Sequence, residues 1–69
     1  MSNVYLAKDI YSKESIEATI TAFANYAKIM ISHNKTHYIC TFENAIYDVE
    51  ETMKEFENYL IDYCNKLDF

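Results

Sequence analysis

The chain has 69 residues, 51% of them hydrophobic, and a formal net charge of −5 at pH 7. This length supports one domain with a small core, and four Phe and seven Tyr indicate a folded chain. The absence of Gly excludes a Gly-rich phosphate-binding loop, and the acidic balance disfavours direct binding to nucleic acid or to an anionic membrane.

The first predicted elements are a strand and a helix. Residues 3–8 alternate in the manner of a short strand. Ser12 is a suitable N-cap, and the helix that it predicts runs from Lys13 to about Tyr26. The apolar face of this helix, at helical spacing, comprises Ile16, Ile20, Phe23, Ala24 and Ala27.

A hairpin is predicted next. Residues 28–32 and 36–42 are rich in β-branched and aromatic side chains, which favours two strands. Asn34 lies between them, and we expect it to adopt the left-handed conformation that a tight hairpin turn demands. Residues 43–47 then connect the hairpin to the last helix.

The longest predicted element is a helix over residues 48–67. Asp48, three residues before Glu51, forms a variant of the capping box and predicts a defined start. Ile61 lies off the apolar stripe of this helix, and we expect it to be exposed. The stripe itself, against which the rest of the domain must pack, comprises Val49, Met53, Phe56, Leu60, Tyr63, Cys64 and Leu67.

The order β-α-β-β-α predicts a single α+β domain over residues 1–69. We expect two layers, with a three-stranded sheet and two helices on one face, which is a ferredoxin-like arrangement that lacks its last strand. In that strand order the first strand lies at a sheet edge, where the missing strand would have paired. The open edge and the open sheet face both suit a chain that works with a copy of itself or a partner bound.

Few residues indicate chemistry, so we expect a protein that is not an enzyme and needs no metal or cofactor. His33 and His37 flank the hairpin turn, but two histidines alone fall short of a zinc site. His37 and Cys40 point to opposite faces of a strand, which favours a buried Cys40 over a nucleophile. Cys40 and Cys64 have no CxxC spacing, and no signal peptide or membrane span is evident. We therefore expect a cytoplasmic protein with reduced thiols.

Two stretches resemble the small HxsD-like proteins. Residues 9–16, Asp-Ile-Tyr-Ser-x-Glu-Ser-Ile, followed by Phe23, are similar to the opening of that family, and residues 55–60, Glu-Phe-Glu-Asn-Tyr-Leu, are similar to its C-terminal helix. The family takes its name from His-Xaa-Ser peptide systems, whose operons pair radical SAM enzymes with short precursor peptides. The resemblance covers most of the chain, which is shorter than the family at its C-terminus. It implies a non-catalytic accessory role in maturing a ribosomally synthesised, post-translationally modified peptide.

By this resemblance, the chain would bind the leader of the precursor peptide, the radical SAM maturase, or both. A leader that adds as a strand to the open edge would lie along residues 4–8, with Tyr5 as an anchor. Tyr59 and Tyr63 are neighbours on the long helix and are further candidates, because Tyr packs its ring while its hydroxyl stays hydrated. The predicted partner-binding residues are Val4, Tyr5, Leu6, Ala7, Lys8, Tyr59 and Tyr63.

Two other functions stay open at this point. The net charge of −5 and the glutamates of the last helix suit a small acidic phage-type inhibitor that binds a basic nucleic-acid enzyme, although interspersed lysines dilute that charge. The open sheet face equally suits a purely structural homodimer.

Overall fold

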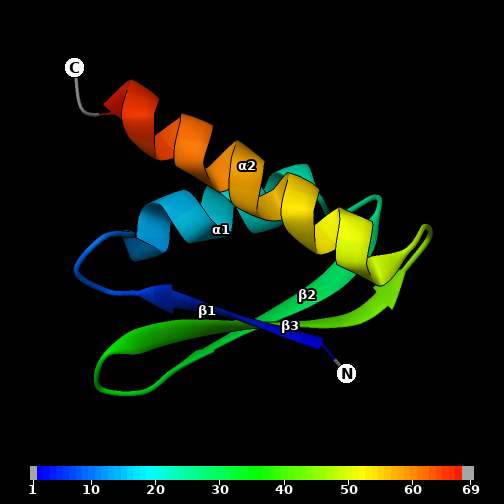
Figure 1. The fold of residues 1–69 in the computed structure, drawn as a ribbon, viewed down its shortest axis with the longest axis horizontal. Coiled ribbons are helices and arrows are strands. Elements are labelled where there is room, and N and C mark those ends of the chain that lie inside the picture. The colour runs from blue at the N-terminus through cyan, green and yellow to red at the C-terminus, as the bar shows by residue number, and fades with distance from the viewer. Residues whose placement is uncertain (1, 68–69) are drawn as a thin grey trace.

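The fold is a three-stranded sheet with two helices on one face. The structure, a computed structural model, describes residues 2–67, with Lys66 and Leu67 described by their backbone only. The sheet is antiparallel with strand order β1-β3-β2, and both helices cover the same side of it (Figure 1). The predicted two-layer α+β fold is confirmed, with the first strand at an edge. The elements are β1 (Ser2–Ala7), α1 (Lys13–Ala22), β2 (Ala27–His33), β3 (His37–Ala45) and α2 (Val49–Leu67).

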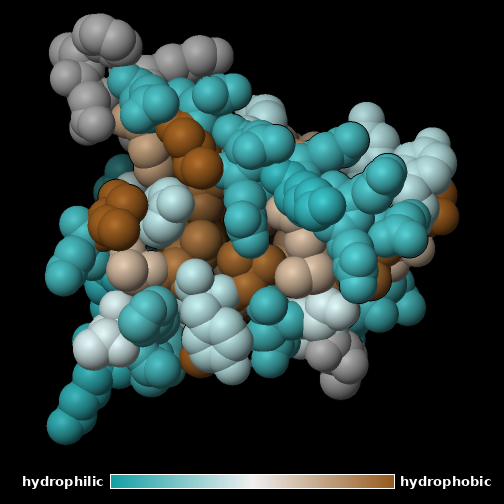
Figure 2. Space-filling view, in the orientation of Figure 1, coloured by the Kyte–Doolittle hydropathy of each residue, from teal (hydrophilic) through white to brown (hydrophobic). Residues whose placement is uncertain are grey.

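The core lies between the two layers and is centred on Phe56 of α2. The Phe56 ring is fully buried and meets the rings of Phe23 and Phe42 edge-on, at centroid distances of 5.6 and 5.3 Å. Figure 2 shows apolar side chains gathered between the helical layer and the sheet, with hydrophilic side chains over α2. The turn after α1 and strand β3 therefore meet α2 through a cluster of three aromatic rings.

The apolar stripe predicted for α2 is confirmed wherever its side chains are described. Phe56 and Leu60 are fully buried, and Val49, Met53 and Cys64 are partly buried and pack against the core. Tyr63 is also partly buried. The side chain of Leu67 lies outside the described residues, and Ile61 is exposed as predicted.

Both helices begin where the sequence predicts. Ser12 Oγ accepts a hydrogen bond from the backbone N–H of Ser15 at 3.1 Å. Asp48 Oδ1 accepts bonds from the N–H groups of Glu50 at 2.8 Å and Glu51 at 3.3 Å. Each cap satisfies donors that have no partner within the first helical turn.

The end of α1 differs from the prediction, because the helix stops at Ala22 rather than near Tyr26. Residues 23–26 instead form a turn in which the N–H of Tyr26 donates to the carbonyl of Phe23 at 2.9 Å. Ala24 is exposed, and Ala27 is buried as the first residue of β2. Ala27 matched the helical spacing of α1 only by coincidence, since it reaches the core from a strand.

The hairpin strands are longer than predicted, and an irregularity explains why. Between Lys28 and Ile29 the register shifts, so that Lys28 pairs with Asn44 and Ile29 pairs with Phe42. The extra residue in β3 is Glu43, and it breaks the apolar alternation at the predicted strand end. It also allows both Phe42 and Ala45, three residues apart, to pack in the core.

Asn34 does not adopt the predicted left-handed conformation: no residue between 2 and 67 has a positive φ. Its side chain shapes the turn instead. Asn34 Oδ1 accepts hydrogen bonds from the N–H groups of Thr36 at 2.9 Å and His37 at 2.8 Å. This arrangement is an Asx-type turn, which Asn favours for its short acceptor and not for its backbone freedom.

Candidate functional site

The outer edge of β1 presents a row of backbone groups. The N–H of Lys8 donates to the carbonyl of Thr36 at 2.9 Å, and this bond shows which residues of β1 direct their backbone groups toward β3. Bonded and non-bonded pairs alternate in an antiparallel sheet, so Val4 and Leu6 also direct their backbone groups toward β3. Residues 3, 5 and 7 direct theirs away from the sheet. Within the described residues no further strand pairs with this edge.

The side chains of β1 divide between the two faces of the sheet. Val4 and Leu6 are buried in the core, so they support the edge and are not accessible to a partner. Tyr5 is 60% exposed on the open face, where its ring meets that of His37 edge-on with centroids 6.5 Å apart. The carbonyl of Ala7 accepts from the N–H groups of residues 10 and 11 at 3.1 and 3.0 Å. The edge therefore offers the N–H groups of residues 3, 5 and 7, the carbonyls of residues 3 and 5, and the ring of Tyr5.

Tyr59 and Tyr63 do not join this edge. Both lie on α2, in the helical layer, whereas the ring of Tyr5 lies on the opposite, uncovered face of the sheet. Tyr59 is 44% exposed and packs edge-on against Phe23, with centroids 5.7 Å apart. A partner that uses the β1 edge together with either of these tyrosines would have to contact both layers.

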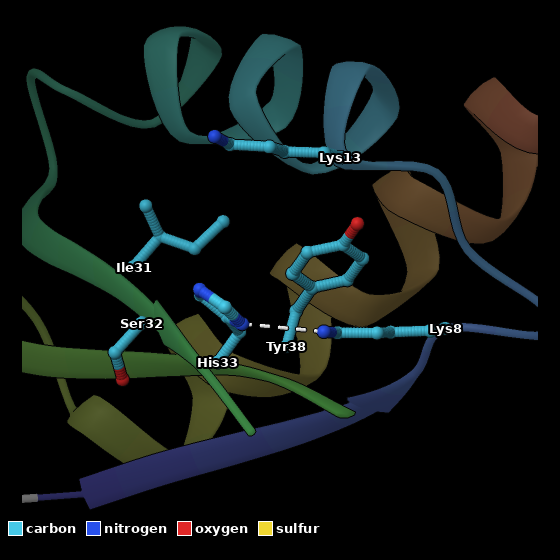
Figure 3. A pocket seen from close by; sticks show the side chains of 6 residues that line it. All are labelled: Lys8, Lys13, Ile31, Ser32, His33 and Tyr38. Carbon is cyan, nitrogen blue, oxygen red and sulfur yellow. Dashed lines mark hydrogen bonds between the residues drawn. The ribbon is translucent and has the colours of Figure 1, made fainter. Parts of the chain in front are cut away.

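Lys8, the last of the predicted edge residues, belongs to a pocket that the sequence did not predict. The pocket has a volume of about 280 Å³ and lies at the hairpin end of the sheet, on the helical side (Figure 3). Lys8 Nζ lies 3.2 Å from His33 Nδ1 and 5.2 Å from the centroid of the Tyr38 ring. The residues that line the pocket are Lys8, Lys13, Ile31, Ser32, His33 and Tyr38. They come from three strands or turns and one helix, so their proximity had no signal in the sequence.

The residues weighed for chemistry do not form a reactive group. Cys40 is fully buried, as predicted, and burial raises the pKa of its thiol from 9.0 to about 11, which keeps it protonated. His37 lies on the open face beside Tyr5, away from Cys40. Among the described residues, no three His, Cys, Asp or Glu side chains are grouped closely enough to hold a metal ion. Over residues 2–67, none of the helices combines the length and the apolar character that a membrane crossing requires.

These features define a class of protein: a small α+β domain with an open strand edge and a positively charged pocket. The family comparison makes the assignment specific. The chain belongs to the HxsD family, described as His-Xaa-Ser system protein HxsD, whose family model matches residues 6–65. This range includes both stretches on which the resemblance rested, and membership links the chain to the His-Xaa-Ser system.

Neither the curated proteins nor the solved structures include a significant match to this chain.

Proposed function

We propose that this protein is a non-catalytic accessory in the maturation of a ribosomally synthesised, modified peptide. In this role it binds the leader of the precursor peptide, the radical SAM maturase, or both, through the edge of β1. The open edge of β1 is the observation that carries the proposal, because unpaired backbone groups bind an extended peptide with little demand on its sequence. Membership of the HxsD family supports a peptide as the partner.

The chemistry of the edge supports binding by strand addition. A peptide that pairs with residues 3, 5 and 7 can form up to five backbone hydrogen bonds, since the carbonyl of Ala7 is already engaged. The exposed ring of Tyr5 lies beside that ladder and gives an amphipathic anchor for one side chain of the peptide. The buried Val4 and Leu6 hold the strand in place, so little ordering cost remains at binding.

A proline substitution tests this proposal because it removes one outward donor without removing a bond of the sheet. The Ala7→Pro variant loses an N–H that faces away from β3, and proline is tolerated at such positions of edge strands. The Ala7→Ser variant is the matched control, since it keeps the N–H. The ligand is a synthetic leader peptide of a His-Xaa-Ser system precursor, titrated by NMR.

The expected result is a shift of the amides of residues 3–8 on titration, with affinity about two- to tenfold weaker in Ala7→Pro than in Ala7→Ser. Unchanged amides over residues 4–8 in the native chain would reject binding at this edge. Sedimentation of the free protein tests the alternative of a structural homodimer. A dimer that forms through β1 would also shift the same amides as the protein concentration rises, without any peptide.

A further inference from the structure

The pocket beside Lys8 reverses the charge of the molecule locally. The chain carries eleven acidic and six basic residues, yet two of those six, Lys8 and Lys13, line this one pocket. No Asp or Glu of the described residues is among its lining. An anion that enters the pocket therefore meets positive charge on two sides, whereas most of the surface repels it.

Lys8 is held in place with donors to spare. Its side chain crosses the sheet toward His33 and passes over the ring of Tyr38, which favours the cation through its π-electrons (Figure 3). A lysine ammonium group only donates, so His33 Nδ1 is the acceptor in this bond. At 3.2 Å this bond uses one of three N–H donors of Lys8 and leaves two for a ligand.

Lys13 provides the opposite wall of the pocket. It is the first residue of α1, and Figure 3 shows its side chain extending along the helix above His33 and Tyr38. Ile31 adds an apolar surface to the lining of the pocket. The lining thus combines separated positive groups with an apolar wall, which suits an anionic head on a short aliphatic stem.

The size of the pocket limits the occupant. A volume of about 280 Å³ lies just under the range of about 300–1,000 Å³ that is usual for sites of drug-sized molecules and cofactors. A single side chain fits this space. Lys8 also follows directly after β1, so the strand that carries the open edge leads into one wall of the pocket.

We propose that this pocket binds the carboxylate of an acidic side chain in the peptide that the protein recognises. Lys8 and Lys13 donate to the carboxylate oxygens, and Ile31 packs against the methylene groups of the acidic residue. The assignment of the carboxylate to a peptide rests on the proposed function, whereas the anion chemistry of the pocket rests on the lining residues alone.

The test uses a probe too short to add as a strand. N-acetyl-glutamate N-methylamide is titrated into the labelled full chain and followed by the amide signals of Lys8, Ser32 and His33. N-acetyl-glutamine N-methylamide is the neutral control of the same shape. We expect saturable shifts with the glutamate probe and at least fivefold weaker binding of the glutamine probe, because ionic hydrogen bonds are the stronger ones.

Lysine variants assign the binding to the pocket. Lys8→Met and Lys13→Met remove the charge but keep most of the aliphatic stem, and each is expected to weaken the glutamate probe at least about threefold. Lys35→Met, at the exposed hairpin turn, and Lys54→Met, on the exposed side of α2, are the matched controls and should change binding less than about twofold. Equal losses in all four variants would overturn the pocket in favour of a diffuse charge effect.

Two further probes separate the sources of the anion. N-acetyl-valine carries a free terminal carboxylate, and inorganic phosphate carries none. Tighter binding of either probe than of the glutamate probe would reject an acidic side chain as the occupant, and equal shifts with the glutamine probe would reject an anion altogether. Because these probes cannot pair with β1, their outcome is independent of the Ala7→Pro test, and each proposal can fail alone.

Discussion

Phe56 allows the packing of this small domain to be tested quantitatively. A chain of 69 residues has a free energy of unfolding of about 3.5–10 kcal/mol, at roughly 0.05–0.15 kcal/mol per residue. Phe56 is fully buried, and truncation of such a residue to Ala costs about 3–5 kcal/mol through lost burial and the cavity left behind. The Phe56→Ala variant is therefore expected to lose a large part of the free energy of unfolding.

A milder variant gives the measurable number. Phe56→Leu keeps an apolar side chain of similar volume but removes the edge-on contacts with Phe23 and Phe42. Each aromatic pair contributes about 0.5–1.5 kcal/mol, so the two together predict a loss of about 2 kcal/mol. With a urea dependence of about 1 kcal/mol per molar for so small a domain, the unfolding midpoint should fall by about 2 M.

The assay is urea unfolding followed by circular dichroism at the helical band. Ile61→Ala is the matched control on the same helix, because Ile61 is off the stripe and 44% exposed, and it should change the stability by less than about 0.5 kcal/mol. If Phe56→Leu lowered the midpoint no more than Ile61→Ala does, the three-ring cluster would not hold the two layers together, and this account of the core would be refuted.

Two further predictions concern Cys40 and Asn34. Because burial raises the pKa of the Cys40 thiol to about 11 while the unfolded chain titrates near 9.0, the folded state keeps its proton longer. The stabilisation is complete below pH 9 and is lost as the pH rises to 11, so the native chain should lose about 2 kcal/mol more than Cys40→Ala over this range. A difference between the urea midpoints of the two chains that stays constant from pH 9 to pH 11 would contradict the shift. Asn34→Gly should destabilise the domain by about 1 kcal/mol in urea unfolding, because it removes the side-chain acceptor at a position that has no need of positive φ. If Asn34→Gly stabilised the domain, the turn would instead need a left-handed residue at this position. Asn34→Asp, which keeps the acceptor, is the control.

The candidate site could be predicted only in part, and the residues of β1 show why. Strand alternation and the missing fourth strand predicted an edge at residues 4–8, and the structure places β1 at that edge. The division between buried Val4 and Leu6 and outward-facing Tyr5 needed the register with β3. The pocket around Lys8 had no local signal at all, since residues 8, 13, 33 and 38 meet only through the hairpin and the crossover of α1.

The sequence by itself determined the elements whose causes are local. The period of α2, the caps at Ser12 and Asp48, and the strand alternation of residues 3–8 all act within a few residues of the chain, and the structure confirms them. The side-chain turn at Asn34 is also local, although the prediction chose a left-handed backbone over an Asx-type turn. The early end of α1 and the extension of β3 past Glu43 were decided by the tertiary structure. In these two places contacts with the core, made by Ala27 from β2 and by Phe42 and Ala45 from β3, outweighed the local pattern, because burial of apolar surface is the main term that stabilises a domain.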